Sequence, residues 1–359
     1  MKRIFLVYDV GPQSRLEWIF AAFKKEDVDV HWIMMRYNEK NRIYRWRKIL
    51  HFYCYLEVAF QTIRKSRQGD VILCWNFIIG TFLSALCRLF GKDRVILSLN
   101  MISHPKQGVV AFLRSKIYNY AFAYPSFLFT VNSATTLHHY QTKYKFDSKH
   151  AFVLPDPYLP IYKEKPFDTS DGYVFCGGEA QRDWHTFCGA AKRLPHRSFV
   201  GVGRKKYMPK NLTIPNNVTM YYDIAEPDFD RLLEKSATVA LPLLSAMPAG
   251  LIVMYKAIFL SKPLIITRIS SIENYLEDEH SAILLFTSDT EGLVKAINKI
   301  IDDKAYAEKL TLHAKEAIKK HSPEAYSQAI YSILQNKDQF GRGANERFKD
   351  DENCREYFG

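Results

Sequence analysis

The stretch SAMPAGLIVMYKAIFLSKPLI, from Ser245 to Ile265, has the pattern of a loop, an apolar helix and a strand. Residues 248–250, Pro-Ala-Gly, fall in the expected first turn of the helix, where proline is well tolerated. One charged residue, Lys256, interrupts the apolar helix. Burying an unpaired ammonium group is costly, so this lysine must face water, an acidic side chain such as Glu273, or an anionic ligand.

The same alternation of strand and helix extends in both directions from this stretch. Strands are expected at 3–9, 28–35, 71–75, 93–100, 126–132, 150–157, 172–178, 197–203, 217–222, 237–244, 263–267 and 281–286. Helices are expected at 16–24, 78–90, 109–122, 183–193, 228–235, 291–301 and 305–319, after the N-cap residue Ser133 and after Pro323. Strands that alternate with helices indicate parallel sheets built from βαβ units.

A segment rich in proline and polar residues divides the chain into two α/β halves. We expect a first Rossmann-like domain at 1–157, a linker at 158–171 and a second Rossmann-like domain at 172–335. The last helix can pack back on the first domain, and 336–359 form a polar tail. The predicted fold class is therefore α/β, with two Rossmann-like domains that face a central cleft.

The composition limits the classes of function. The chain has 359 residues, is 47% hydrophobic and carries a net charge of +12, which favours an anionic partner. The six cysteines are scattered and form no Cys-x-x-Cys pair, which favours buried thiols in a reducing compartment. The longest uncharged run, 71–87, is better explained by a strand and a helix than by a membrane span.

The stretch from Arg36 to Arg67 mixes basic and aromatic residues. A helix of this kind can lie on an anionic membrane, or it can be a domain helix with a solvated basic face. No signature of nucleic-acid binding accompanies it, so nucleic acid is not an expected partner.

Two glycine motifs follow expected strands of the second half. Gly177-Gly178 precede Arg182 at a helix start, and Gly203 precedes Arg204. Backbone N–H groups and an arginine at such a place form a natural phosphate site, and a glycine turn with a surface arginine is the alternative. The first strand is followed by Gly11 alone and lacks the G-x-G-x-x-G pattern, so a nicotinamide cofactor is not expected.

Acidic triplets occur at 27–29 and 228–230, and similar triplets bind metal in some sugar transferases. We interpret both as structural, because the first opens a strand and the second lies in a first helical turn, where aspartate suits the helix dipole. We therefore expect no metal and no cofactor. His104, after an apolar strand, is by itself more often a structural residue.

The order of these motifs resembles the GT-B glycosyltransferases of the family 4 type, described as glycosyl transferases group 1. The resemblance is strongest from Gly172 to His321, through FCGGEAQRDW, FVGVGR, AGLIVMYKAIFLSKPLIITRISSIENYLEDEHSAILLF and DTEGLVKAINKIIDD. The first half is similar in layout only, through SLNMISHP, LFTVNSATTLHHY and VLPDP. The resemblance implies a nucleotide-sugar donor in the second domain, an acceptor in the first, a retained anomeric configuration and no metal.

The motifs and the resemblance together give the expected site residues. The catalytic residues would be His104, Arg182 and Lys256, and the residues on the acceptor side would be Gly11, Gln13 and Arg15. The donor-binding residues would be Gly178, Arg182, Gly203, Arg204, Tyr222, Ala249, Gly250, Leu251, Lys256 and Glu273.

The sequence departs from the family pattern at one important place. The family has one glutamate in the loop before the opening helix and another within that helix. Here the loop 243–250 contains no acid, and the helix position is Lys256, which cannot accept hydrogen bonds from ribose hydroxyl groups.

We expect a cytoplasmic glycosyltransferase, or one peripheral at the inner face of the membrane, that acts in surface polysaccharide or glycoconjugate assembly. Its partners would be a nucleotide sugar, a glycan or lipid-linked acceptor and an anionic membrane surface. Two alternatives remain open: a nucleotide-sugar epimerase of the same fold, and a catalytically silent nucleotide-sugar binder or partner subunit.

Overall fold

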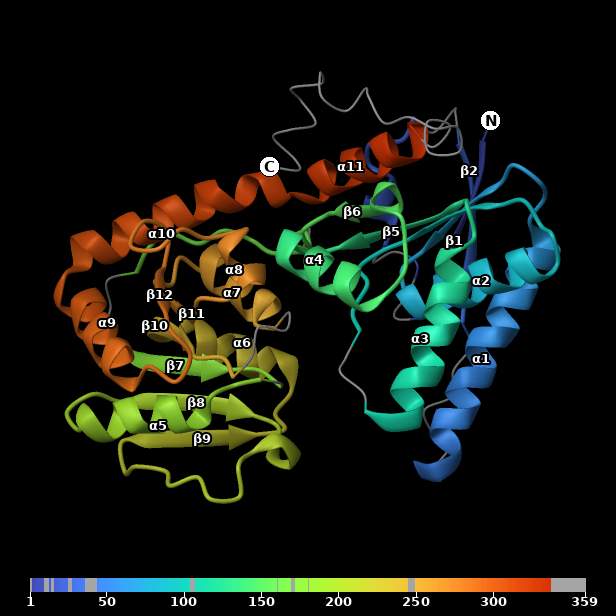
Figure 1. The fold of residues 1–359 in the computed structure, drawn as a ribbon. Helices are drawn as coiled ribbons and strands as arrows, with labels where there is room; N and C mark the ends of the chain where they lie inside the picture. Colours follow the sequence, from blue (N-terminus) through green and yellow to red (C-terminus); the bar gives the residue numbers. More distant parts are fainter. Residues whose placement is uncertain are drawn as a thin grey trace. The chain divides into compact units, whose positions relative to one another are not determined.

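The structure is a computed structural model, and it divides into two compact units. The first comprises Met1–Asp156 and Pro323–Gly359, and the second comprises Pro157–Ser322. The described residues are 2–9, 13, 16–24, 28–35, 44–103, 107–159, 161–168, 172–179, 181–244 and 249–336. Each unit has its own sheet and core, and each is described by itself (Figure 1).

The first unit contains a six-stranded parallel sheet in the order β2-β1-β3-β4-β5-β6. Its strands are β1 (Lys2–Tyr8), β2 (Val28–Met34), β3 (Val71–Cys74), β4 (Val95–Ser98), β5 (Phe127–Val131) and β6 (Ala151–Val153). Its helices are η2 (Glu17–Phe20), α1 (Tyr44–Lys65), α2 (Phe77–Leu89), α3 (Gly108–Phe122), α4 (Ala134–Lys143), η3 (Ser148–His150) and α11 (Pro323–Gln335). The expected helix after Ser133 is confirmed, because Ser133 Oγ accepts a hydrogen bond from Thr136 N at 3.1 Å.

Both faces of this sheet are buried, which explains why its strands are apolar throughout. Successive side chains of β1 point to opposite faces, so Phe5 and Val7 belong to one core cluster and Ile4 and Leu6 to another. Helices α1, α2 and α3 lie side by side in Figure 1, and residues of α1, α2 and α3 contribute to the first cluster. Residues of η2 and α11 contribute to the second cluster.

The expected helix at 16–24 is wrong, because only the 3-10 helix η2 forms there. Ser327 of α11 accounts for the early end. Its hydroxyl donates to Ile19 O at 2.7 Å and accepts from Ala22 N at 2.9 Å. These bonds take backbone groups that a longer helix would have paired internally.

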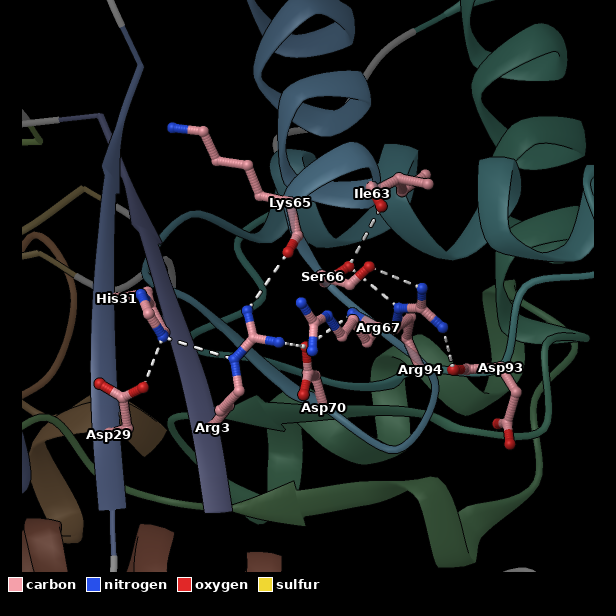
Figure 2. A network of polar contacts seen from close by, with 10 residues as sticks. All are labelled: Arg3, Asp29, His31, Ile63, Lys65, Ser66, Arg67, Asp70, Asp93 and Arg94. Atoms are coloured by element: carbon pink, nitrogen blue, oxygen red, sulfur yellow. Dashed lines mark hydrogen bonds and ion pairs between the residues drawn. The ribbon is translucent and has the colours of Figure 1, made fainter. Parts of the chain in front are cut away.

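A polar network lies at the amino ends of the strands in the first unit (Figure 2). Arg94 is buried, and its guanidinium donates to Ser66 Oγ at 2.9 Å and to Ser66 O at 2.8 Å. Arg3 donates to Lys65 O at 3.3 Å, so two arginines bind carbonyl groups at the end of α1, where cations are stabilised. Asp29, from the first acidic triplet, accepts from His31 at 2.8 Å in the same network.

The second unit contains a six-stranded parallel sheet in the order β12-β11-β10-β7-β8-β9. Its strands are β7 (Tyr173–Gly177), β8 (Phe199–Gly203), β9 (Val218–Tyr222), β10 (Ser236–Leu241), β11 (Leu264–Thr267) and β12 (Ile283–Leu285). Its helices are α5 (Trp184–Arg193), η4 (Lys205–Tyr207), α6 (Glu226–Glu234), α7 (Leu251–Phe259), α8 (Ser270–Glu273), α9 (Thr290–Asp302), α10 (Lys304–Ile318) and η5 (Lys319–His321). The predicted α/β class is confirmed by these two parallel sheets.

The segment that we expected to be a linker is anchored on the second unit. Lys165 N donates to Phe259 O at 2.8 Å, and Ser261 Oγ donates to Lys165 O at 2.5 Å. The rings of Tyr158 and Tyr162 pack on Phe259, with centroids 5.0 and 5.5 Å away. The boundary accordingly lies between Asp156 and Pro157, and α11 belongs to the first unit.

The strand order defines a switch point in each sheet. In the second unit β7 lies next to β10, and the chain proceeds from β7 through β8 and β9 in one direction and from β10 through β12 in the other. In the first unit β1 and β3 occupy the equivalent positions. Ligands of open α/β sheets bind beyond the carboxyl ends of the strands at such points, so these two places are where a site is expected.

Candidate functional site

The loops that follow β7 and β10 are joined at the switch point of the second unit. Asp183 N donates to Pro242 O at 2.9 Å, and Leu244 N donates to Gln181 O at 3.0 Å. Leu243 N donates to Thr267 Oγ1 at 2.8 Å, which fixes the same loop to the end of β11. Backbone hydrogen bonds therefore hold this edge of the sheet in one shape.

Gly178 allows the turn directly after β7. Its φ of +133° lies in a region that side chains other than glycine rarely adopt. A Cβ at this position would lie 2.2 Å from Nη2 of Arg182. The missing side chain at Gly178 thus lets the guanidinium group of Arg182 lie against the backbone of this turn.

Arg182 is buried, so the interpretation as a surface arginine is wrong. It is 6% exposed, and its Nε donates to Gly177 O at 2.7 Å. Burial lowers the pKa of the Arg182 guanidinium, and the thiol of Cys176 opposes this shift. An anionic ligand at this edge would stabilise the buried charge, because charge-assisted hydrogen bonds are stronger than neutral ones.

The N-terminus of α5 is occupied by its own cap. Asp183 Oδ1 accepts from Thr186 N at 3.0 Å, and Asp183 Oδ2 accepts from Thr186 Oγ1 at 2.7 Å. Ser288 Oγ also donates to this carboxylate at 3.2 Å. A carboxylate therefore already sits where a phosphate would bind, so α5 is a poor anion cradle.

The N-terminus of α7 differs, because Gly250 is its N-cap and offers no side-chain acceptor. The first N–H groups of a helix have no intrahelical partner and favour an anion. A Cβ on Gly250 would lie 3.6 Å from Leu243, which forms a β-bridge with Arg182. The open end of α7 and the buried guanidinium therefore belong to one edge of the unit.

The expected start of this helix needs correction. The φ of Gly250 is +88°, so the residue lies before the helix and not in its first turn, and α7 begins at Leu251. Ala249 and Gly250 are half-buried beside that start. Residues 245–248 lie outside the described part of the chain.

Lys256 is paired with α6 across the helix interface. Its Nζ lies 2.6 Å from Asp230 Oδ1 and 2.8 Å from Glu226 Oε1, and it lies 5.6 Å from the ring centre of Phe229. Burial lowers the pKa of Lys256, but the hydrogen bonds and charges of Asp230 and Glu226 leave it raised overall. The lysine thus pairs with acids of α6, whereas Glu273, which the sequence suggested as its partner, lies beside Arg268.

Glu273 lies on α8 and is exposed. Its Oε1 is 4.0 Å from Nη1 of Arg268. Both residues line a cavity of about 880 Å³ between segment 268–284 and the end of α10. Of the expected donor-binding residues, this cavity contains Glu273 alone.

The remaining donor-side residues follow β8 and β9. Arg204 forms an ion pair with Glu179, and its Nη1 lies 3.7 Å from Asp223 Oδ1. A Cβ on Gly203 would lie 2.9 Å from the ring of Trp184, so this glycine accommodates a core side chain. Tyr222 ends β9 and is half-buried.

The acceptor-side residues and the catalytic candidate His104 fall mostly on residues that the structure does not describe. Gly11, Arg15 and His104 lie outside the described residues, and Gln13 is exposed. At the switch point of the first unit, Asn76 Nδ2 donates to Asp9 Oδ2 at 2.5 Å. The sequence analysis missed this pair, although both residues closely follow strands that turn out to be neighbours.

Tyr55 of α1 completes this polar group. Burial raises the pKa of the Tyr55 hydroxyl, the charge of Asp9 raises it further, and a hydrogen bond with Asn76 opposes the shift. Asn76 also caps α2 by accepting from Ile78 N at 2.8 Å. The described part of the first unit thus offers a carboxylate, an amide and a hydroxyl group at its switch point.

The described residues contain neither a metal-binding cluster nor a membrane-spanning helix. Within the described ranges, no group of three or more His, Cys, Asp and Glu side chains is arranged to hold a metal ion. Likewise, no helix in the described part of the chain has the length and hydropathy needed to cross a bilayer. In the second acidic triplet, Asp228 pairs with Arg231 at 3.1 Å and Asp230 with Lys256.

Comparison with protein families gives one match. Residues 190–321 match the family described as glycosyl transferases group 1. The resemblance expected from the motifs is therefore confirmed over this segment, which lies within the second unit. No curated protein matches the sequence.

Solved structures with low sequence identity share the whole fold. HepE from Anabaena, in complex with UDP and glucose, has a TM-score of 0.68 at 15% identity, and the match covers 94% of this chain and 100% of that chain. Sucrose-phosphate synthase from Thermosynechococcus elongatus has a TM-score of 0.68 at 14% identity, over 94% and 99% of the two chains. The lipopolysaccharide outer core galactosyltransferase WaaB has a TM-score of 0.63 at 12% identity, over 94% and 100%. The expected GT-B fold is confirmed by these similarities.

Proposed function

We propose that this protein transfers a sugar from a nucleotide-sugar donor to a glycan or lipid-linked acceptor, in surface polysaccharide or glycoconjugate biosynthesis. The observation that carries the proposal is that a buried guanidinium, Arg182, lies at the same switch point as the N-terminus of α7, whose N-cap Gly250 offers no side-chain acceptor. Together they suit a diphosphate. The match of 190–321 to glycosyl transferases group 1 supports the same function.

The chemistry would depend on stabilising the leaving nucleoside diphosphate. Negative charge grows on the diphosphate as the bond to the sugar breaks, and fixed donors aimed at that charge lower the barrier. Arg182 and the first N–H groups of α7 would supply these donors. We propose a metal-independent reaction with retained configuration, in which His104 lies near the transferred sugar and residues 11–15 near the acceptor.

Lys256 then has a positioning role. Its ammonium group is held by Asp230 and Glu226 of α6, so it fixes α7 against α6. The position of the helix determines where its N-terminal N–H groups point. Arg204, Tyr222 and Glu273 remain proposed donor contacts, and the base and sugar would be chosen in this region.

A catalytically silent nucleotide-sugar binder is the second candidate. The absence of an acid in 243–250 and the presence of Lys256 favour it, because hydrogen-bond acceptors for the ribose are missing there. An epimerase of the same fold would need no acceptor. Turnover of the nucleotide sugar, with and without added acceptor, separates the three: a transferase needs the acceptor, an epimerase does not, and a silent binder converts nothing.

The proposal is tested through Arg182. A panel of nucleotide sugars is screened by thermal shift, and the best donor is titrated by calorimetry into the wild type, Arg182→Gln and Arg182→Lys. Loss of charge-assisted hydrogen bonds should weaken binding by about 10- to 100-fold in Arg182→Gln, and less in Arg182→Lys. Because Arg182 is buried, the melting temperature of each variant is measured first.

Arg193→Gln is the matched control, because Arg193 ends the helix that Arg182 precedes and pairs with Glu291 at the surface. Its donor affinity should equal that of the wild type. Equal affinity for the folded Arg182→Gln variant would refute the proposed diphosphate site. Failure of every nucleotide sugar to bind would refute the function itself.

We further propose a cytoplasmic protein that lies at the inner face of the membrane. The net charge of +12 and the basic stretch 36–67 support this location. Lipid-linked acceptors lie in that membrane.

A further inference from the structure

Helix α3 exposes large apolar side chains along its N-terminal part. None of its residues before Tyr118 is buried, and its buried residues are Tyr118, Ala121 and Phe122. Val109 is 72% exposed and Phe112 is 60% exposed. The other exposed apolar residues of this helix are Val110, Leu113, Ile117 and Tyr120. We call residues 109–117 the α3 apolar face.

This face is unusual for a helix on a buried sheet. A domain helix normally places an apolar stripe on the core and polar residues outside. Here the core receives only the C-terminal third of α3, while the apolar residues of the first two turns face solvent. Contiguous exposed apolar surface usually marks a contact with another molecule or with a membrane.

The location of the face follows from the βα topology. Helix α3 follows β4, so its first turn lies near the carboxyl ends of the strands. This is the edge where Asp9 and Asn76 pair at the switch point of the same unit. The first turn of α1 lies near this edge as well, and in Figure 1 the N-terminal ends of α1 and α3 lie at the same end of the unit.

Charge favours an anionic partner. The sequences of α1, α2 and α3 contain one acid, Glu57, whereas α1 alone has three basic residues in its first five, YRWRK. On α3 itself, Lys116 lies 5.2 Å from the ring centre of Phe112. Basic side chains beside an apolar face are typical of helices that lie in a bilayer interface, where the charges reach the phosphates.

The same charges disfavour a second copy of this chain on the α3 apolar face. Self-association through α3 would bring Lys116 of both copies together, and α3 contains no acid to pair with it. Like charges that face each other across an interface are repulsive. An anionic bilayer meets both the apolar and the cationic requirement.

We propose that the α3 apolar face inserts into the headgroup region of an anionic bilayer and that Lys116 binds lipid phosphates. Lys116 and the net charge of +12 thus supply attraction, and α3 supplies the apolar anchor. This inference deepens the proposed function, since a lipid-linked acceptor would meet the enzyme at the carboxyl edge of the first unit. The binding itself requires no catalysis.

Vesicle sedimentation of the full chain tests the proposal without any nucleotide. The variant Val109→Ser/Phe112→Ser/Leu113→Ser changes exposed residues only. The control is Ile161→Ser/Phe286→Ser/Leu312→Ser in the second unit, where the three residues are 70%, 72% and 59% exposed. We expect the wild type and the control to bind vesicles made of phosphatidylglycerol and phosphatidylcholine. The affinity of the α3 variant for these vesicles should be lower by about tenfold or more.

Pure phosphatidylcholine should bind the wild type weakly, and salt should weaken binding to the anionic vesicles. Equal binding of the α3 variant and the wild type to anionic vesicles would overturn the proposal. So would the absence of wild-type binding. Sedimentation velocity without lipid addresses self-association: a wild-type dimer that the α3 variant abolishes would assign the face to a second copy and also overturn it.

A fluorescent label reports insertion directly. The described cysteines, Cys54, Cys74, Cys87, Cys176 and Cys188, are buried, so Val110→Cys in a Cys354→Ser background gives one reactive exposed site. An environment-sensitive dye there should shift to the blue with anionic vesicles and become protected from iodide. The same dye at Leu312→Cys should not shift. A dye at position 110 that stays accessible to iodide would contradict insertion.

Calorimetry with the donor separates this inference from the proposed function. An α3 variant that binds the nucleotide sugar but not vesicles supports both. A wild type that turns over nucleotide sugar and does not bind vesicles refutes the membrane proposal alone. A wild type that binds vesicles through α3 but binds no nucleotide sugar refutes the proposed function alone.

Discussion

The Nζ atom of Lys256 lies 2.6 Å from Oδ1 of Asp230, so the one charge of α7 is fixed against α6. The lysine side chain is 10% exposed, whereas that of Asp230 is 46% exposed. The carboxylate can therefore return to water if the lysine is removed, but the ammonium group would stay buried if the carboxylate were removed. The two partners should differ in how much their loss costs.

For Lys256→Met we expect a decrease of about 1 kcal/mol in the free energy of unfolding, because the exposed acids become hydrated and the methionine packs. Lys256→Glu should lower the free energy of unfolding further, because the new glutamate would lie beside the carboxylates of Asp230 and Glu226. Urea unfolding measures both, and Arg231→Met, which breaks the exposed pair with Asp228, is the control. A Lys256→Glu variant as stable as the wild type would contradict this structural role.

Gly178→Ala should disturb Arg182 more than the fold. The φ of +133° and the 2.2 Å approach to Arg182 Nη2 predict a loss of about 1–3 kcal/mol in stability and a weaker donor affinity. Gly69→Ala is the control, since its φ is +82° and a Cβ there would meet nothing within 4 Å. Urea unfolding should show a similar loss of stability for both variants. Calorimetry should show a loss of donor affinity for Gly178→Ala alone.

Asp156 should make the first unit less stable as the pH rises. Burial raises the pKa of its carboxyl group to about 6, and the hydrogen bond from Asn100 Nδ2 at 2.8 Å partly opposes this shift. The folded state then holds the proton more tightly than the unfolded chain. The resulting stability is present below pH 4 and is lost between about pH 4 and 6.

The variant Asp156→Asn removes this titration. Relative to the wild type, it should gain about 1–3 kcal/mol between pH 4 and pH 7 in urea unfolding. A difference between variant and wild type that stays constant with pH would mean that Asp156 ionises normally.

His321 should make the second unit less stable as the pH falls, the opposite of the effect of Asp156. Burial lowers its pKa to about 4, the hydrogen bond to Asn274 O at 3.0 Å opposes this shift, and Lys320 adds to it. The unfolded chain then binds a proton more tightly than the folded one. The contribution of His321 to stability is present above about pH 6.5 and decreases as the pH falls toward 4.

In His321→Gln the glutamine amide can still donate to Asn274 O, but no proton is taken up. The wild type should lose about 2–3 kcal/mol more than this variant between pH 6.5 and pH 4. Because Asp156 and His321 oppose each other over the same range, the wild-type profile alone would conceal both. Parallel profiles for His321→Gln and the wild type would disprove the contribution of His321.

The order of strands and helices was determined by the sequence alone, because it depends on residues that lie close together in the chain. Apolar runs between turn residues marked both sheets, and a single hydroxyl, Ser133, fixed the start of α4. The order of elements indicated two Rossmann-like halves, and the resemblance to GT-B glycosyltransferases implied the GT-B fold, which the solved structures confirm. The same local patterns predicted too long a helix at 16–24, where Ile19 O accepts a hydrogen bond from Ser327 and not from a later residue of the same helix.

Only the tertiary structure decided which strands are neighbours, because strand pairing depends on contacts between residues far apart in the chain. The adjacency of β7 and β10 brings Arg182 beside Leu243 and buries its charge, whereas the sequence alone leaves a solvated surface arginine as an alternative. The partners of Lys256 lie 26 and 30 residues before it, on a helix that no periodicity in α7 indicates. Local sequence can state that a buried lysine needs a partner, but the packing of α6 on α7 selects which acids meet it.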